Sequence, residues 1–380
     1  MTPSKAGLRS ALLAALLAVA GTANAQQTLI VYNWNDYIDE STLADFQKET
    51  GLHVDYRTFE SDAEYQKLLA ERAPMDVIHP SVKDVGALIE QKAIVAINSN
   101  KEISDFKEFA PLVRGRLQTQ DPHNEYVVPY LGGAVGIAVR NDLVTAALGD
   151  TPVIPSWDLL FSQEYKEKLG GCGMSMLDAP DEVAAIYLNY RGAMVSAASA
   201  RTVKRYMNRL QDDVVGFKNI HNAEYIEGLA NGTTCAAMVW EGDAYFAKEE
   251  GHDVSFIQPQ EGTIFFLDTM AVPAHSANKD AAIKYIQFMN RQDIAERNAM
   301  YTLYRSPHQN LQTAIEDSRA ASGFAHASSS YKNPLFGTPK MTEAGKAQVA
   351  LSWDAMVASY LAKKAPAVAS VTTIKVEKVQ

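Results

Sequence analysis

The stretch LIVYNWNDYIDESTLADFQKETGLHVDY at residues 29–56 decides the fold of this chain. Residues 29–34 form a short, mainly apolar run that is typical of a buried strand. A helical spacing of apolar side chains follows, between a predicted N-cap at Ser41 and a stop at Gly51. Residues 52–56 then alternate between apolar and polar side chains, which predicts a second strand. A strand, a helix and a strand joined by short turns indicate parallel strand pairing.

The same alternation continues along the chain and predicts an α/β fold. A helix is expected at 63–72, a third strand at 75–78 and another helix at 85–91. The order βαβαβα indicates a mostly parallel sheet flanked by helices. Because 380 residues exceed what one hydrophobic core usually organises, we expect two lobes of this kind.

Glycines mark the predicted passage between the lobes. The strand-like segment 127–139 contains Gly132, Gly133 and Gly136, which are expected to permit backbone rotation near residue 134. A second α/β alternation follows, and the apolar segment 265–272 is expected to lead back, so the two passages form a hinge. The predicted organisation is a signal peptide at 1–25, the first lobe at 26–133, the second lobe at 134–264, a return to the first lobe at 265–335, a C-terminal helical region at 336–362 and an unassigned tail at 363–380.

The N-terminus has the features of an export signal. Lys5 and Arg9 precede an apolar run at 11–20, and residues 23–25 read Ala-Asn-Ala, the small-x-small form of a cleavage site. The run is shorter than the roughly 20 apolar residues that span a bilayer. We therefore expect cleavage after Ala25 and a periplasmic location.

The composition describes an ordered globular protein with an acidic surface. Hydrophobic residues make up 47% of the chain and charged residues 21%. The 45 Asp and Glu outnumber the 35 Lys and Arg, which gives a formal net charge of −10. This balance disfavours a nucleic-acid partner and suits a cationic ligand.

Three distant segments place an aromatic side chain beside a carboxylate where an apolar run stops. They begin at Trp34, Trp240 and Phe265 and read Trp-Asn-Asp-Tyr, Trp-Glu-Gly-Asp and Phe-Phe-Leu-Asp. Aromatic faces attract cations and accept methylene groups, whereas carboxylates fix the positions of positive heads. If folding brings these strand ends together, they line a cleft for an organic cation.

Cys172 and Cys235 are the only cysteines in the sequence. Each lies at the start of a predicted strand, and an oxidising compartment favours a structural disulfide between them. A catalytic thiol is the competing interpretation, although no His or Asn pattern near either cysteine supports it.

The motifs of common enzymes are absent from the sequence. It contains no Walker loop, no Gly-x-Gly-x-x-Gly, no Gly-x-Ser-x-Gly, no His-Glu-x-x-His and no Cys-x-x-Cys. The eight histidines are scattered singly, and His221 and His252 are interpreted as surface groups. We therefore expect no metal, no cofactor and no catalysed reaction.

Several motifs, in the same order along the chain, resemble those of the periplasmic polyamine-binding receptors of ABC transporters. The likeness covers residues 28–362. It implies the two-lobed type II periplasmic-binding-protein fold and delivery of putrescine or spermidine to a membrane permease. The motifs are Val-Tyr-Asn-Trp-Asn-Asp-Tyr-Ile at 31–38, Phe-Gln-Lys-Glu-Thr-Gly at 46–51, Ser-Trp-Asp at 156–158, Leu-Asp-Ala-Pro-Asp-Glu-Val at 177–183, Leu-Ala-Asn-Gly at 229–232 and Trp-Glu-Gly-Asp at 240–243.

The resemblance also implies roles for individual residues. Aromatic walls and ring or hydroxyl contacts are expected from one set, ammonium-binding carboxylates from a second, and polar contacts at the first lobe's cleft edge from a third. Cys172 and Cys235 match the cysteine pair of the putrescine-type members. The three sets are Trp34, Tyr37, Trp240, Phe266 and Tyr304; Asp36, Glu182, Asp243 and Asp268; and Asn35 and Ser81.

Three positions depart from the family pattern. Asn35 stands where the family usually has Ser or Thr, and Lys83-Asp84 stand where smaller or aromatic residues are usual. A lysine near the cleft would repel a long polycation. Because Ala179, Asp243 and Phe266 resemble the shorter-diamine type, putrescine is the first choice of ligand, with cadaverine, agmatine and spermidine as alternatives.

Other classes of function stay open at this point. An exported thiaminase-like enzyme would use Cys172 or Cys235 as a nucleophile. A ferric-ion receptor on this fold would need adjacent tyrosines, which the sequence does not contain. Asp178 and Asp181 are interpreted as caps of the helix that contains Val183 rather than as ligands. The expected partners of a monomeric receptor are a polyamine and an ABC permease.

Overall fold

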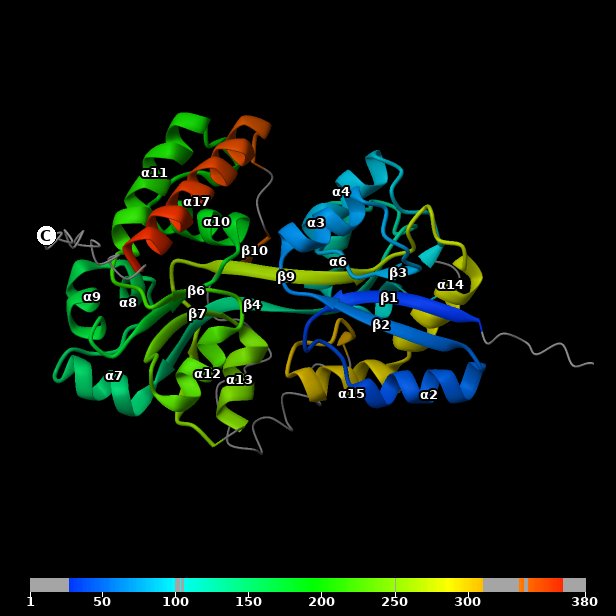
Figure 1. Ribbon diagram of the computed structural model, residues 1–380, viewed down its shortest axis with the longest axis horizontal. Helices are drawn as coiled ribbons and strands as arrows, with labels where there is room; N and C mark the ends of the chain where they lie inside the picture. The colour runs from blue at the N-terminus through cyan, green and yellow to red at the C-terminus, as the bar shows by residue number, and fades with distance from the viewer. Residues whose placement is uncertain are drawn as a thin grey trace, which may run out of the picture.

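The computed structural model describes residues 27–99, 103, 106–249, 251–309, 335–337 and 341–364. The predicted signal peptide and the tail beyond Lys364 lie outside these residues. Within the described ranges, every helix is too short or too polar to cross a bilayer. Figure 1 shows two bodies of helices and strands side by side, joined by the long strands β4 (Val128–Arg140) and β9 (Thr263–Met270).

The first lobe is built on a three-stranded parallel sheet with the order β2-β1-β3, which confirms the predicted βαβαβα start. Helix α2 ends at Gly51, whose φ of 72° is left-handed, as predicted. The predicted N-cap at Ser41 is wrong by two residues, because Asp39 accepts the hydrogen bond from the Ser41 backbone amide. The lobe contains β1 (Thr28–Trp34), α2 (Glu40–Thr50), β2 (His53–Phe59), α3 (Asp62–Ala70), β3 (Val77–Ile78), α4 (Val82–Glu90), η1 (Phe106–Glu108), α6 (Pro111–Gln118), α14 (Lys279–Met289) and α15 (Gln292–Thr302).

The larger sheet is mixed, so the expectation of a mostly parallel sheet in each lobe is wrong for the second lobe. Its order is β10-β9-β4-β7-β5-β6, with β8 also paired to β4. Strand β4 runs antiparallel to β7, β8 and β9, because the chain leaves the first lobe on β4 and returns on β9. The lobe adds α7 (Asn141–Leu148), α8 (Asp158–Phe161), α9 (Gln163–Leu169), β5 (Met174–Met176), α10 (Pro180–Tyr190), η2 (Val195–Ala197), α11 (Ala200–Asp213), β6 (Asn219–Ile220), α12 (Glu224–Asn231), β7 (Ala236–Trp240), α13 (Glu241–Glu249), β8 (Val254–Ile257), β10 (Leu335–Phe336) and α17 (Glu343–Lys364).

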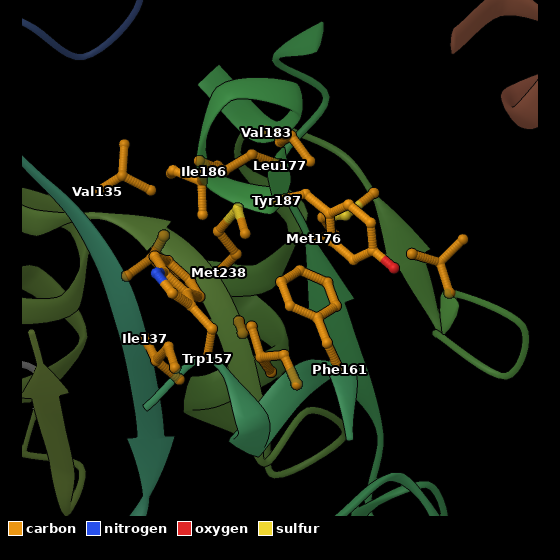
Figure 2. Packing of buried hydrophobic residues seen from close by; sticks show 14 of the residues in the cluster. Val135, Ile137, Trp157, Phe161, Met176, Leu177, Val183, Ile186, Tyr187 and Met238 are labelled. Carbon is orange, nitrogen blue, oxygen red and sulfur yellow. The ribbon is translucent and has the colours of Figure 1, made fainter. Parts of the chain in front are cut away.

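Each lobe has its own hydrophobic core, and the change from one core to the other falls within β4. Leu131 packs in the first core and Val135 in the second. Figure 2 shows the second core, where Trp157, Phe161 and Tyr187 pack beside aliphatic and methionine side chains. Trp353 of α17 also belongs to this core, so the C-terminal helix is part of the second lobe. The finer domain limits stay a prediction.

The glycines of β4 leave space for a neighbouring aromatic ring and for neighbouring backbone. None of Gly132, Gly133 and Gly136 has a positive φ, and β4 is continuous with an irregularity between Pro129 and Gly132. A Cβ atom at Gly136 would lie 2.3 Å from the Phe256 ring, and one at Gly132 would lie 2.7 Å from the Phe266 carbonyl oxygen. Side chains at these positions would push the neighbouring strands away from β4.

A buried ion pair holds the point at which β4 passes between the lobes. The guanidinium of Arg305 donates to the Glu241 carboxylate with a shortest distance of 2.7 Å, and both side chains are at most 7% exposed. Glu241 also accepts a hydrogen bond from the Ala134 amide at 2.9 Å, and Arg305 exchanges backbone hydrogen bonds with Gly132. Strand β4, α13 and the segment after α15 are therefore fixed to one another.

Candidate functional site

A cavity of about 400 Å³ is lined by residues of both lobes. It contains every side chain that the sequence predicts for ligand binding, although these residues come from six distant segments. This volume is within the range of small-molecule sites. The predicted residues brought together there are Trp34, Asn35, Asp36, Tyr37, Ser81, Glu182, Trp240, Asp243, Phe266, Asp268 and Tyr304.

Aromatic rings form a continuous wall in edge-to-face contact. The Trp240 and Phe266 centroids lie 4.9 Å apart at an interplanar angle of 78°, and those of Phe266 and Tyr304 lie 5.8 Å apart at 75°. Tyr304 then meets Tyr37 at 4.9 Å and 75°. Such contacts hold each ring in place and leave faces that can contact methylene groups or a cation.

Trp34 is the last residue of β1 and is held by its neighbours before any ligand binds. Its indole Nε1 donates to the His79 carbonyl oxygen at 3.1 Å, and its ring packs edge-on against Phe59 at 4.5 Å. His79 in turn contacts the Tyr32 carbonyl oxygen through Nδ1 at 2.8 Å. Burial lowers the pKa of His79 to about 4, so this imidazole is neutral and supports the site structurally.

Asp243 lies in the first turn of α13, where two tyrosine hydroxyl groups hold its carboxylate. Tyr304 donates at 2.6 Å and Tyr225 donates to the other oxygen. Burial raises the pKa of Asp243 to about 6, although both hydrogen bonds oppose this rise. Tyr225 lies outside the residues predicted from sequence, because an isolated tyrosine on α12 gives no sign of its distant partner.

Asp268 lies on β9 and is 7% exposed. Its backbone pairs with that of Ser81, which brings the end of β3 and the start of α4 beside this carboxylate. Burial raises the pKa of Asp268 to about 8, a rise that the nearby Tyr37 hydroxyl and Lys83 partly offset. The Tyr37 hydroxyl is itself buried and forms no hydrogen bond of good geometry within the described residues. An ammonium group between these two side chains would satisfy both.

Lys83 carries a positive charge into the cavity. Its ammonium lies 2.8 Å from Glu182 Oε1 and 2.7 Å from Asp62 Oδ2. Burial would lower the pKa of Lys83, but Glu182 and Asp62 outweigh this effect and raise it. Burial likewise pushes the pKa of Glu182 up whereas Lys83 pulls it down, and the short contact favours the ionised pair. The positive charge of Lys83 therefore balances the negative charge of Glu182 within the protein.

Asn35 and Asp36 form the exposed edge of the cavity beside Trp34. The Asn35 side-chain amide donates to the Asp36 carboxylate at 2.9 Å. Asp36 has a φ of 52°, which aspartate tolerates better than most residues. This turn directs the chain from β1 along the cavity to Tyr37.

The interpretation of Asp178 as a helix cap is wrong. The Asp178 side chain does not cap α10, since Ala179 occupies the cap position and Asp178 accepts a hydrogen bond from Trp353 Nε1 at 2.8 Å. The His221 side chain is 42% exposed, as expected of a surface group, and it also lines the cavity. Its Nδ1 accepts from the backbone amides at the start of α12. Asp181 lies in the first turn of α10, where a carboxylate favours the helix dipole.

Cys172 and Cys235 form a disulfide with a Cα separation of 5.6 Å. It joins the segment before β5 to the residue before β7, and neither cysteine lines the cavity. Neither sulfur is therefore a free nucleophile. Within the part of the chain that the structure describes, no group of three or more His, Cys, Asp or Glu side chains has the arrangement of a metal site.

Comparison with known proteins identifies relatives of this architecture. Residues 41–323 match the family described as bacterial extracellular solute-binding protein. The chain is 34% identical over 314 residues to the putrescine-binding periplasmic protein PotF of Escherichia coli, covering 79% of this chain and 84% of that protein. It is 28% identical over 299 residues to a putrescine/agmatine-binding protein of Pseudomonas aeruginosa, covering 77% and 81%.

Solved structures share the fold. A putative spermidine/putrescine ABC transporter protein from Listeria monocytogenes superposes with a TM-score of 0.75 at 23% identity, over 87% of this chain and 99% of that one. The spermidine/putrescine substrate-binding protein PotD from Streptococcus pneumoniae gives a TM-score of 0.67 at 23% identity, over 87% and 99%. The fold predicted from the sequence, with its two lobes of type II, is thereby confirmed.

Proposed function

The chain belongs to the bacterial extracellular solute-binding proteins, and on this premise we propose that it is a periplasmic receptor for a small aliphatic polyamine. Putrescine is the first choice of ligand, and an ABC permease is the partner that receives it. The printed names of the relatives, putrescine-binding and putrescine/agmatine-binding, support this choice. The word periplasmic in the name of the Escherichia coli relative supports export of this chain. The Ala-Asn-Ala sequence at residues 23–25 places the proposed cleavage after Ala25.

One observation carries the proposal: buried carboxylates at separate places in a cavity whose intervening wall is aromatic. Asp243 and Asp268 are held on different elements, α13 and β9. Tyr304 donates to Asp243 and packs against both Phe266 and Tyr37, and the Tyr37 hydroxyl lies near Asp268. An amino acid would bring its own carboxylate next to these acids and be repelled. A slender chain with an ammonium at each end satisfies both the charges and the rings.

The energetics require charge recognition at both ends. Burying four methylene groups of putrescine contributes only about 3 kcal/mol, at about 0.8 kcal/mol each. Micromolar affinity corresponds to about 8 kcal/mol, before the cost of ordering the ligand. Cation–π contacts add roughly 1 to 2 kcal/mol each. Charge-assisted hydrogen bonds to Asp268 and Asp243 are the interactions strong enough to supply the rest.

We assign the side chains accordingly. Asp268 and the Tyr37 hydroxyl hold one ammonium, and Asp243, with Asp36 at the cavity edge, holds the other. Trp34, Trp240 and Phe266 enclose the methylenes between them. Closure is a hinge motion about β4 and β9, and a ligand that contacts both lobes stabilises the closed form. Catalysis forms no part of this function, and the receptor acts as a monomer.

The competing functions have less support. A thiaminase-like enzyme would need a reactive thiol in the cavity, whereas the two cysteines form a disulfide elsewhere. Agmatine and cadaverine have the same cationic ends as putrescine and stay as alternative ligands, and the name of one relative includes agmatine.

A thermal-shift screen followed by calorimetry tests the proposal. Putrescine, cadaverine, agmatine and spermidine are compared with 1-aminobutane, which keeps the four-carbon chain but has a single ammonium. We expect saturable binding of at least one diamine, little binding of 1-aminobutane, and a loss of about tenfold or more in Asp268→Asn. Absence of binding by every polyamine, with the protein folded, would reject the proposal.

A further inference from the structure

Lys83 is the only lysine or arginine among the described residues that line the cavity. Eight carboxylates share that lining with it. Its side chain is 10% exposed and reaches Glu182, which is 5% exposed, and Asp62, which is 34% exposed. The carboxylates are Asp36, Glu60, Asp62, Glu64, Asp178, Glu182, Asp243 and Asp268.

One of the two Lys83 ion pairs, that with Glu182, joins the first lobe to the second across the cavity. Lys83 lies in the first turn of α4 and Asp62 at the start of α3, both in the first lobe, whereas Glu182 lies in the first turn of α10 in the second lobe. The backbone of Ser81, two residues before Lys83, pairs with that of Asp268. The cluster of Lys83, Glu182 and Asp62 therefore lies next to the carboxylate that holds one end of a diamine.

The chemistry of a lysine side chain matches that of the expected ligand. It is an ammonium on a flexible four-carbon stem, which is the aminobutyl unit of a polyamine attached to the backbone. Its ammonium makes the contacts with Glu182 and Asp62 that a ligand ammonium at this end would make. Both acids are thereby engaged before a ligand arrives.

We propose that Lys83 is a built-in ammonium that occupies the position of a third ligand ammonium and makes the receptor select diamines over triamines. The inference rests on the proposed function and specifies its substrate class. A triamine that extends past Asp268 would bring its third ammonium against Lys83 and find both acids already paired. A diamine ends at Asp268 and leaves the cluster intact. Rejection of the longer ligand thus comes from a repulsive element within the site.

A structural role for Lys83 makes a different prediction. If the ion pairs only stabilise the fold, removal of the charge lowers stability and leaves the ratio of diamine to triamine affinity unchanged. If Lys83 determines specificity, removal changes that ratio. The ratio of the two affinities in one variant is therefore the decisive measurement.

Calorimetry with putrescine and spermidine on Lys83→Met and Lys83→Gln tests the proposal. Met keeps the length of the stem, and Gln keeps a polar end that can donate to Glu182. We expect spermidine affinity to rise about tenfold or more relative to putrescine in both variants. Lys83→Arg retains the cation and should retain the wild-type preference, as should Lys67→Met, which alters an exposed lysine outside the cavity.

The outcomes separate the two proposals. Wild-type protein that binds no polyamine contradicts the proposed function itself. Wild-type protein that binds putrescine, with folded Lys83→Met and Lys83→Gln showing no gain for spermidine, contradicts only the role of Lys83. Equal wild-type affinity for putrescine and spermidine contradicts it as well. Reversal of the gain by Glu182→Gln in the Lys83→Met background would support it, because the Glu182 carboxylate, no longer in contact with Lys83, is the expected partner of the third ammonium.

Discussion

Ligand affinity should depend steeply on pH through Asp268. Burial raises the pKa of this carboxyl to about 8 in the empty site, so below pH 8 it is mainly protonated. An ammonium ligand needs the ionised form, and binding must therefore expel a proton. Affinity rises with pH up to about 8 and then levels off. The neighbouring charges are Lys83, which lowers the pKa, and Asp62 and Glu182, which raise it.

The magnitude follows from the ionised fraction. With a pKa of about 8, roughly 1% of the Asp268 side chains are ionised at pH 6 and about half at pH 8, which predicts an increase in putrescine affinity of about fiftyfold. At pH 7, binding should release about 0.9 proton from this group. Asp243, whose pKa is about 6, adds a smaller dependence at the acidic end.

Folding stability of the empty protein should show the opposite trend. The folded-state pKa of Asp268 lies above its ordinary value of 3.8, so the folded state holds a proton that the unfolded chain releases. The contribution of this group to the free energy of unfolding therefore falls as pH rises from about 4 to about 8 and is constant above. Ligand should restore stability most strongly near pH 8.

Calorimetry at pH 6, 7 and 8, in pairs of buffers with different ionisation enthalpies, measures both quantities. Asp268→Asn cannot ionise, so its weaker binding should vary little between pH 7 and 8. Asp212→Asn, which alters an exposed acid outside the cavity, should retain the wild-type profile. A wild-type affinity that is constant from pH 6 to 8, with no net proton release at pH 7, would refute the reasoning.

Further predictions concern one wall of the cavity, the disulfide and the hinge. Trp240→Ala should weaken putrescine binding about tenfold or more in calorimetry, because a cation–π face and methylene contacts are lost, and unchanged affinity would contradict this wall assignment. Replacing both Cys172 and Cys235 by serine should lower the free energy of unfolding by about 2 to 4 kcal/mol in urea titrations while affinity below the melting range changes little, whereas a large loss of affinity would mean that the bridge shapes the site. Arg305→Met should destabilise by about 3 to 5 kcal/mol, since it leaves Glu241 buried without its cation; adding Glu241→Gln should recover part of that loss, and full additivity of the two changes would argue against the pair.

The local pattern of this sequence predicts much of the fold. The strand at 28–34, the helix that ends at Gly51 and the parallel order of the first sheet follow from apolar spacing and one left-handed glycine. The mixed second sheet does not, because the antiparallel pairing of β4 with β7 and β9 joins segments more than 90 residues apart. No spacing within one strand records which distant strand lies beside it.

The composition of the site is likewise more predictable than its connections. Aromatic residues and acids at the ends of apolar runs indicate an organic cation, and they do line one cavity. The contact of Lys83 with Glu182 joins residues 99 positions apart, and its geometry decides whether that lysine repels a ligand or neutralises an acid. The hydrogen bond of Tyr225 to Asp243 likewise cannot be predicted from local sequence patterns, because its geometry depends on the tertiary fold.

The buried ion pair of Arg305 and Glu241 would be the pivot of the proposed hinge motion. Sliding one lobe along the other would pull the guanidinium from its carboxylate in a dry environment, which is costly, whereas tilting about the pair keeps the contact. For a given tilt, the travel of each atom grows with its distance from the pivot. In the proposed hinge motion, residues beside Ala134 would move least, and contacts at the outer rim of the cleft would separate by the largest distance.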